Sequence, residues 1–266
     1  MLNLLNIGRP YMNTEQIKSY LRKENRHIKI ITVRETASTN DELKKPVFSQ
    51  GNETVLFIAD SQTAGRGRKG RSFFSPEGTG IYMSLLLHPD LTPEECTLIT
   101  PLCAVATAEA IERVTGVKAD IKWVNDIFVG GKKVAGILTE GSFTKNGADY
   151  IIVGIGINIS VPENGFPDEI RDIAGAVTEG SAEIREQLIA ETVNRFMLHL
   201  SGIRSRDFVP LYRERLFFLG QEITVLSPEG SYKATAVDTD SDCRLTVKTE
   251  AGEIKSLLSG EISVKI

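Results

Sequence analysis

The pattern of hydrophobic and polar residues changes character near residue 219. Before it, short runs rich in β-branched and aliphatic residues, typical of buried strands, alternate with segments of helical periodicity. The expected strands are 28–33, 55–59, 81–87, 121–124, 127–129, 134–138 and 150–159. The main helices are expected at 102–115 and 188–200, and a polar loop at 162–180. This pattern predicts a large α+β domain.

Turn and cap residues refine several of these elements. Asn13 suits the N-cap of a short helix, and Thr39 with Glu42 forms a capping-box pattern that predicts another helix directly after the first strand. Pro101 is expected to interrupt the segment before the 102–115 helix, and Gly116 to close that helix. Paired glycines at 130–131 and Asn-Gly at 146–147 predict tight hairpins.

Beyond residue 219 the chain has short, closely spaced alternating runs. Strands are expected at 222–226, 232–237, 244–248 and 262–266, and such spacing suggests a small barrel. We therefore predict a short N-terminal helical segment at 1–27, a catalytic domain at 28–218 and a small β domain at 219–266.

Composition excludes several classes of protein. The net charge of -4 argues against a general nucleic-acid binder. No apolar stretch is long enough to span a bilayer, and the first residues lack the pattern of a secretory signal. The 3 cysteines show no metal-ligand spacing and are typical of reduced cytoplasmic thiols. A cytoplasmic protein without a membrane partner is therefore expected.

Residues 62–71, Gln-Thr-Ala-Gly-Arg-Gly-Arg-Lys-Gly-Arg, stand out against this acidic background. Glycines allow close backbone approach to a ligand, and arginines match phosphate and carboxylate oxygens. The segment satisfies the G-x-G-x-x-G pattern of dinucleotide-binding folds, but a strand follows where that motif requires a helix. On composition alone, a nucleic-acid-binding turn and a solvated surface loop both remain open.

Four further motifs follow the order known from one family. Ser38-Thr39-Asn40 precedes the loop; Lys-Trp-Val-Asn-Asp at 122–126, Lys-Lys-Val-Ala-Gly-Ile-Leu at 132–138 and Gly-Ile-Gly-Ile-Asn at 154–158 follow it. Together with the loop, these segments resemble the signature motifs of biotin protein ligases. The tail 259–264 resembles the end of that family's C-terminal domain more weakly. Val124 replaces the family's usual proline, and Phe73 stands where tryptophan is common, which puts local geometry in doubt.

The resemblance implies a fold and a reaction. The fold would be a central mixed β-sheet flanked by helices, of the class II aminoacyl-tRNA synthetase-like biotin/lipoate ligase type, with a small C-terminal SH3-like β-barrel. The reaction would join biotin and ATP into biotinyl-5'-AMP and transfer biotin to a lysine of a biotin carboxyl carrier protein. Fixed cations and Mg²⁺ would offset the repulsion between carboxylate and triphosphate. No enzyme nucleophile is needed.

The resemblance also assigns residues to roles. The catalytic cations would be Lys133, Arg66, Arg68 and Lys122. The biotin-binding residues would be Ser38, Thr39, Asn40, Gln62, Arg66, Gly67, Arg68, Lys133, Gly136, Gly154 and Gly156. The nucleotide-binding residues would be Arg68, Lys122 and Asn158. Asp126 would bind Mg²⁺ or accept the proton of the incoming lysine.

Simpler explanations exist for several of these residues. Lys133 could be an ordinary exposed strand lysine, and Asp126 a turn residue after an asparagine. Thr39 could serve merely as a helix cap, and Gly154 and Gly156 could merely allow a kink in a strand, without any ligand. The loop is expected to be disordered without ligand and to close over the adenylate.

Other functions are also open at this point. A lipoate ligase or acyltransferase could use the same fold, and a non-catalytic biotin sensor could use the same pocket. Fewer than about 30 residues precede the first strand, with one convincing helix, whereas a helix-turn-helix needs two. We therefore expect the form without a DNA-binding domain, with no DNA partner. A homodimer is possible.

Overall fold

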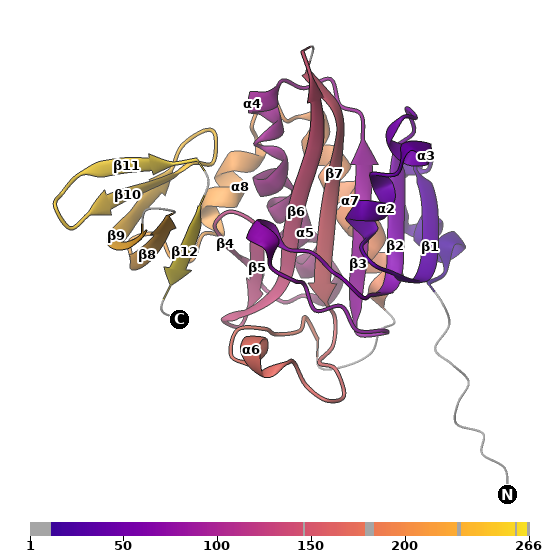
Figure 1. Ribbon diagram of the computed structural model, residues 1–266, viewed down its shortest axis with the longest axis horizontal. Coiled ribbons are helices and arrows are strands. Elements are labelled where there is room, and N and C mark those ends of the chain that lie inside the picture. Colours follow the sequence, from indigo (N-terminus) through magenta and orange to yellow (C-terminus); the bar gives the residue numbers. More distant parts are fainter. Residues whose placement is uncertain (1–11, 146, 179–183, 228–229, 259, 265–266) are drawn as a thin grey trace, which may run out of the picture.

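The computed structural model describes residues 12–145, 147–178, 184–227, 230–258 and 260–264. Its larger sheet has seven strands in the order β1-β2-β3-β7-β6-β5-β4 (Figure 1). These strands are β1 (Lys29–Thr36), β2 (Val55–Gln62), β3 (Gly80–Leu87), β4 (Asp120–Lys122), β5 (Asp126–Val129), β6 (Lys132–Thr144) and β7 (Gly147–Asn158). β1 and β2 are parallel, and the other neighbours are antiparallel. The expected mixed sheet is confirmed.

Helices cover both faces of this sheet. The α-helices are α1 (Thr14–Tyr20), α2 (Thr39–Leu43), α3 (Pro46–Ser49), α4 (Pro93–Cys96), α5 (Ile99–Thr115), α6 (Asp168–Arg171), α7 (Arg185–Ser201) and α8 (Phe208–Glu214). Two short 3-10 turns are η1 (Lys23–Asn25) and η2 (Arg68–Gly70). α5 and α7 pack together against one face, and α2 lies on the other (Figure 1). Among the described residues, no helix combines the length and apolarity needed to cross a membrane.

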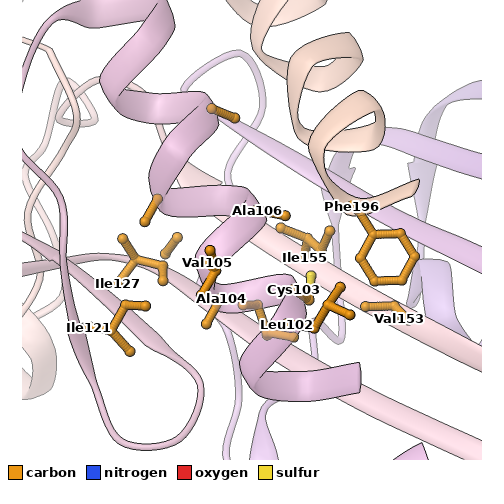
Figure 2. Packing of buried hydrophobic residues seen from close by; sticks show 14 of the residues in the cluster. Leu102, Cys103, Ala104, Val105, Ala106, Ile121, Ile127, Val153, Ile155 and Phe196 are labelled. Atoms are coloured by element: carbon orange, nitrogen blue, oxygen red, sulfur yellow. The ribbon is translucent and has the colours of Figure 1, made fainter. Parts of the chain in front are cut away.

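The main core lies between the sheet and the α5–α7 pair. Leu102 and Cys103 of α5 pack with Phe196 of α7 over Val153 and Ile155 of β7 (Figure 2). A smaller apolar cluster lies on the opposite face, under α2, and comprises Leu43, Val55, Phe57, Leu86 and Ile152. Successive strand residues alternate between the two faces. The even-numbered positions of β7 therefore face α2.

Residues 222–264 form the second sheet, which has five antiparallel strands. These are β8 (Glu222–Ser227), β9 (Gly230–Thr239), β10 (Leu245–Thr249), β11 (Ile254–Leu257) and β12 (Glu261–Val264), in the order β11-β10-β9-β8-β12. An SH3-like arrangement is consistent with this sheet. In the described part of the chain β11 and β12 are the two edges of this sheet, and no pairing closes it into a full barrel.

Several local expectations need correction. Ser38, not Thr39, is the N-cap of α2, and its hydroxyl accepts from the Asp41 N–H. Pro101 lies within the first turn of α5, where the missing N–H costs no hydrogen bond, so it does not interrupt the helix. β4 ends at Lys122, two residues earlier than expected. Gly116 closes α5 with φ 75°, as expected. Asn146 lies outside the described residues.

Candidate functional site

A cavity of about 430 Å³ lies on the α2 face of the larger sheet. Every site residue expected from the sequence lines it: Ser38, Thr39, Asn40, Gln62, Arg66, Gly67, Arg68, Lys122, Asp126, Lys133, Gly136, Gly154, Gly156 and Asn158. Five motifs that are far apart in the sequence thus meet at one place. A solvated surface loop at 65–71, or a mere strand kink at Gly154 and Gly156, would not explain why these motifs meet at one cavity.

The strand register makes the cavity floor. Gly154 and Gly156 of β7 lie opposite Leu138 and Gly136 of β6 and share the face that carries α2. A Cβ on Gly156 would come within 2.5 Å of the Phe73 ring, and one on Gly136 within 3.4 Å of the Lys133 side chain. Glycine is therefore required at 156, where the Phe73 ring occupies the space above the sheet, whereas a Cβ at 136 would make an ordinary contact.

Lys133 reaches this face through a β-bulge. Ile127 pairs with Ala135, but the next residue, Phe128, pairs with Lys133, so Val134 is an extra residue on β6. In a regular strand, residues 133 and 136 would point to opposite faces. The bulge re-aims Lys133 toward the cavity, as bulges do near active sites. Its ammonium lies 2.7 Å from Asp126 Oδ1.

One end of the cavity is a neutral hydrogen-bonding cluster. The N–H and the hydroxyl of Thr39 both donate to Gln62 Oε1, at 2.9 and 3.2 Å. Gln62 Nε2 in turn donates to Ser75 Oγ at 2.9 Å, and Ser84 Oγ lies 2.7 Å from Thr39 Oγ1. Hydroxyl and amide groups of this kind can accept from and donate to a small polar ring.

Asn40 lies beside this cluster and is almost fully buried. Its Oδ1 accepts from Ser84 Oγ at 2.5 Å, and its Nδ2 donates to Glu140 Oε2 at 2.8 Å. The amide packs directly on Gly154, where a Cβ would come closer than 3.0 Å to it. The side chain therefore has one orientation, which α2, β3 and β6 impose together.

The other end of the cavity carries cations. Arg68 Nη1 donates to the neutral Asn125 Oδ1 at 2.9 Å. Lys122 lies 6.0 Å from the centroid of the Phe128 ring, and burial lowers the pKa of its ammonium. Neither cation has a carboxylate within 4.0 Å in the described part of the chain. Their charge is therefore available for an anionic ligand.

The Gly-Arg loop (residues 65–71) closes one side of the cavity. Arg66 bridges to Ser72, which makes the loop a tight antiparallel turn, and Lys69 takes a left-handed conformation with φ 55°. Phe73 follows the turn and lies over Gly136 and Gly156. The expected disorder of this loop without ligand is not tested by one conformation and stays a prediction.

The second sheet contributes a wall that we did not expect from the sequence. Leu226 and residues 260–263 line the cavity, and Glu261 forms an ion pair with Arg71 of the Gly-Arg loop. Trp123 Nε1 donates to Cys243 O at 3.0 Å and joins the two sheets. The resemblance of the tail 259–264 to the family was the one sequence feature that could have indicated this wall. Its periodicity alone only indicated a strand.

Metal ligands are sparse around the cavity. Within the described residues, no group of three His, Cys, Asp or Glu side chains could hold a metal ion. Mg²⁺ commonly uses one or two carboxylates together with substrate phosphates. Asp126 fits that limited role, although its carboxylate already pairs with Lys133.

Comparison with known proteins supports the resemblance. Residues 32–158 match the biotin/lipoate A/B protein ligase family, and residues 218–265 match the biotin protein ligase C-terminal domain. A biotin protein ligase from Aquifex aeolicus, solved in complex with biotin and ATP, is 31% identical with a TM-score of 0.72. The match covers 88% of this chain and 97% of that one.

Two curated relatives extend the comparison. The bifunctional ligase/repressor BirA of Bacillus subtilis is 36% identical over 217 residues, which is 80% of this chain and 66% of BirA. This chain therefore spans slightly under two thirds of that relative. The biotin–[acetyl-CoA-carboxylase] ligase of Mycobacterium tuberculosis is 27% identical, with 85% of this chain and 88% of the relative covered. From its sequence motifs, its fold and these matches, this chain belongs to the biotin protein ligase family.

Proposed function

We propose that this protein activates biotin with ATP and transfers it to a lysine of a biotin carboxyl carrier protein. The observation that supports this most directly is the polarity of one cavity. A neutral hydrogen-bonding cluster at one end, around Thr39 and Gln62, suits an uncharged ureido ring. Cations without carboxylate partners at the other end, Arg68 and Lys122, suit phosphates.

The reaction has two steps. The biotin carboxylate attacks the α-phosphorus of ATP, a new C–O–P link forms, and pyrophosphate leaves. The carrier amine then attacks the acyl carbon, AMP leaves with the electron pair of the C–O bond, and the amine loses a proton. Mg²⁺, held mainly by phosphates and by Asp126, would supply further neutralisation of charge. We propose that Asp126 alternatively accepts the proton of the incoming lysine.

The residues of the cavity divide into groups along the bound intermediate. Ser38, Thr39, Asn40 and Gln62 would bind the ureido ring. The glycines at 136, 154 and 156 would admit the apolar chain of biotin close to the sheet. Lys133, between the two ends of the cavity, would hold the carboxylate against the α-phosphate.

The nucleotide would lie toward the cationic end. Arg68 and Lys122 would contact phosphate oxygens, and Asn158, at the end of β7, would contact adenine or ribose. The Gly-Arg loop, with Arg66 and Gly67, would exclude water that hydrolyses the mixed anhydride. In this scheme electrostatic positioning supplies most of the rate, because no covalent enzyme intermediate is formed.

We propose the division of the chain at 1–27, 28–218 and 219–266, which the two separate sheets support. The carrier protein is the proposed partner. A homodimer, the absence of a DNA partner and a cytoplasmic location stay predictions.

Incorporation of biotin into an apo carrier domain tests the function. Purified protein, ATP, Mg²⁺ and biotin should label the carrier lysine, and omission of ATP should abolish the label. Calorimetry with biotin and with lipoate distinguishes the ligase classes, and we expect heat of binding for biotin alone. Biotin binding without carrier labelling would favour a sensor. Binding of lipoate in place of biotin would overturn the proposed substrate.

A further inference from the structure

A cluster of four charged side chains, of which Arg66 alone lines the cavity, joins the Gly-Arg loop to the biotin end. Arg66 Nη1 lies 2.5 Å from Asp41 Oδ1, and Arg66 Nη2 lies 3.1 Å from Glu140 Oε1. Lys44 contacts the same two carboxylates, each at 2.9 Å. Two cations and two anions thus form a closed, neutral group between the loop, α2 and β6.

Glu140 is the member of this group whose two carboxylate oxygens contact different partners. Its Oε1 accepts from Lys44 and forms an ion pair with Arg66, and its Oε2 accepts from Asn40 Nδ2 at 2.8 Å. Its side chain is 23% exposed. Burial by itself would raise the pKa of Glu140, but the hydrogen bonds and charges of Asn40, Lys44 and Arg66 hold that pKa below its usual value. The carboxylate therefore remains charged at neutral pH.

The two arginines of the loop differ in how their charge is balanced. Arg66 is bound by two carboxylates, whereas Arg68 donates to the neutral Asn125. A guanidinium whose charge is already balanced adds little attraction for a phosphate. Arg66 is thus placed to fasten the loop, and Arg68 to contact the ligand.

We infer that Glu140 is a positioning residue that fastens the Gly-Arg loop through Arg66 and orients Asn40 for biotin. It does not line the cavity and acts through these two side chains. Loop closure and recognition of the biotin ring then depend on one carboxylate. This inference rests on the proposed function for its kinetic part, but the fastening of the loop can be measured without any activity.

Two substitutions separate the two contacts. In Glu140→Gln the amide oxygen can still accept from Asn40, but the amide nitrogen cannot accept from Arg66 or Lys44. Glu140→Ala removes both contacts. Glu42→Gln is the matched control, because Glu42 is 24% exposed, pairs with Lys45 at the start of α3 and does not contact Arg66.

The rate of limited trypsin digestion within the Gly-Arg loop measures directly how firmly Glu140 holds the loop in place. Trypsin cleaves after the arginines and the lysine of the loop, and all these sites remain in the three variants. We expect cleavage within residues 65–71 to be about 3- to 10-fold faster in Glu140→Gln and Glu140→Ala than in wild type, the range expected for part-buried ion pairs. Glu42→Gln should match wild type. Equal cleavage in Glu140→Gln and Glu42→Gln would overturn the inference.

Enzyme kinetics test whether Glu140 affects both loop closure and biotin recognition. We expect Glu140→Gln to release biotinyl-adenylate faster with the KM for biotin nearly unchanged, and Glu140→Ala also to raise that KM. A merely destabilised protein would lower kcat without this split. Equal biotin KM values in the two variants would refute the role in orienting Asn40. Failure of wild type to label the carrier would refute the proposed function, while the trypsin result would still decide the fastening.

A double-mutant cycle identifies the partner of Glu140. Cleavage is compared after Arg68, Lys69 and Arg71, because Arg66→Gln removes the trypsin site after residue 66. If Arg66→Gln and Glu140→Gln act through the same contact, the double variant should be cleaved at these sites no faster than either single variant. Fully additive effects would mean that the two residues act independently, and the inference would be wrong.

Discussion

Gly154→Ala should damage biotin binding through Asn40. The added Cβ would lie closer than 3.0 Å to Asn40 Oδ1 and within 3.1 Å of its Nδ2. The amide would have to move by roughly 1 Å to restore an ordinary contact. It cannot do so and keep its hydrogen bonds to Ser84 and Glu140, which hold it from both sides at 2.5 and 2.8 Å.

The cost follows from the burial of this amide. Asn40 is 4% exposed, so a lost partner is not replaced by water. Each unsatisfied buried polar group costs about 1–3 kcal/mol, so breaking both hydrogen bonds costs at least about 2 kcal/mol. If the loss falls on binding, biotin affinity drops by about 30-fold or more. If it falls on folding, Tm drops by at least roughly 4 °C.

Isothermal calorimetry with biotin and thermal unfolding measure the two outcomes. Gly202→Ala is the control, because its Cβ would meet Ser205 Oγ at 3.4 Å and its φ of -108° suits other residues. Gly156→Ala should lower Tm less than Gly154→Ala, because the partly buried Phe73 ring can rotate away from the added methyl group. If Gly154→Ala keeps wild-type Tm and biotin affinity within about 2-fold, the orientation of Asn40 is not what the structure indicates.

Three further results are expected. Lys133→Ala should reduce carrier labelling by about 10²–10³-fold. Lys132→Ala is the control and should leave labelling unchanged, because the exposed Lys132 ammonium contacts only a backbone carbonyl; equal labelling by the two variants would refute the assignment. The lowered pKa of Glu140 stabilises the fold above its ordinary value of 4.5, and this stability is lost as pH falls through the folded pKa. Urea unfolding of Glu140→Gln should therefore depend less on pH between about 5 and 3 than that of wild type. Burial raises the pKa of Cys103 to about 12, so a thiol reagent at neutral pH should modify it only on unfolding, which mass spectrometry can follow.

Hydrophobic periodicity was a good guide to the sheet and the long helices. It was less reliable where competing signals meet. Ser38 and Thr39 both belong to the residue types that suit an N-cap, and the turn geometry places Ser38 there. We did not expect α8, which carries Pro210 in its first turn, where the missing N–H of proline is tolerated. The short, exposed edge strand β11 lacks a hydrophobic face and was also missed.

The site could be predicted from motifs but not from periodicity. Strand alternation alone would place Lys133 on the face opposite Gly136, because the bulge at Val134 depends on pairing with β5. Glu140 reads as an ordinary polar position near the exposed part of β6. Its role depends on Arg66 and Asn40, which are 74 and 100 residues away in the chain. Such contacts follow from the tertiary fold and leave no local pattern.

The wall that the second sheet adds to the cavity makes the pocket modular. Leu226 and residues 260–263 belong to the second sheet and lie apart in the sequence from the motifs proposed to bind biotin. A chimaera carrying this sheet from another ligase would keep the chemistry of residues 38–158 and receive a different surface beside the nucleotide end. Inhibitors that extend toward Leu226 would then discriminate between ligases whose signature motifs are the same.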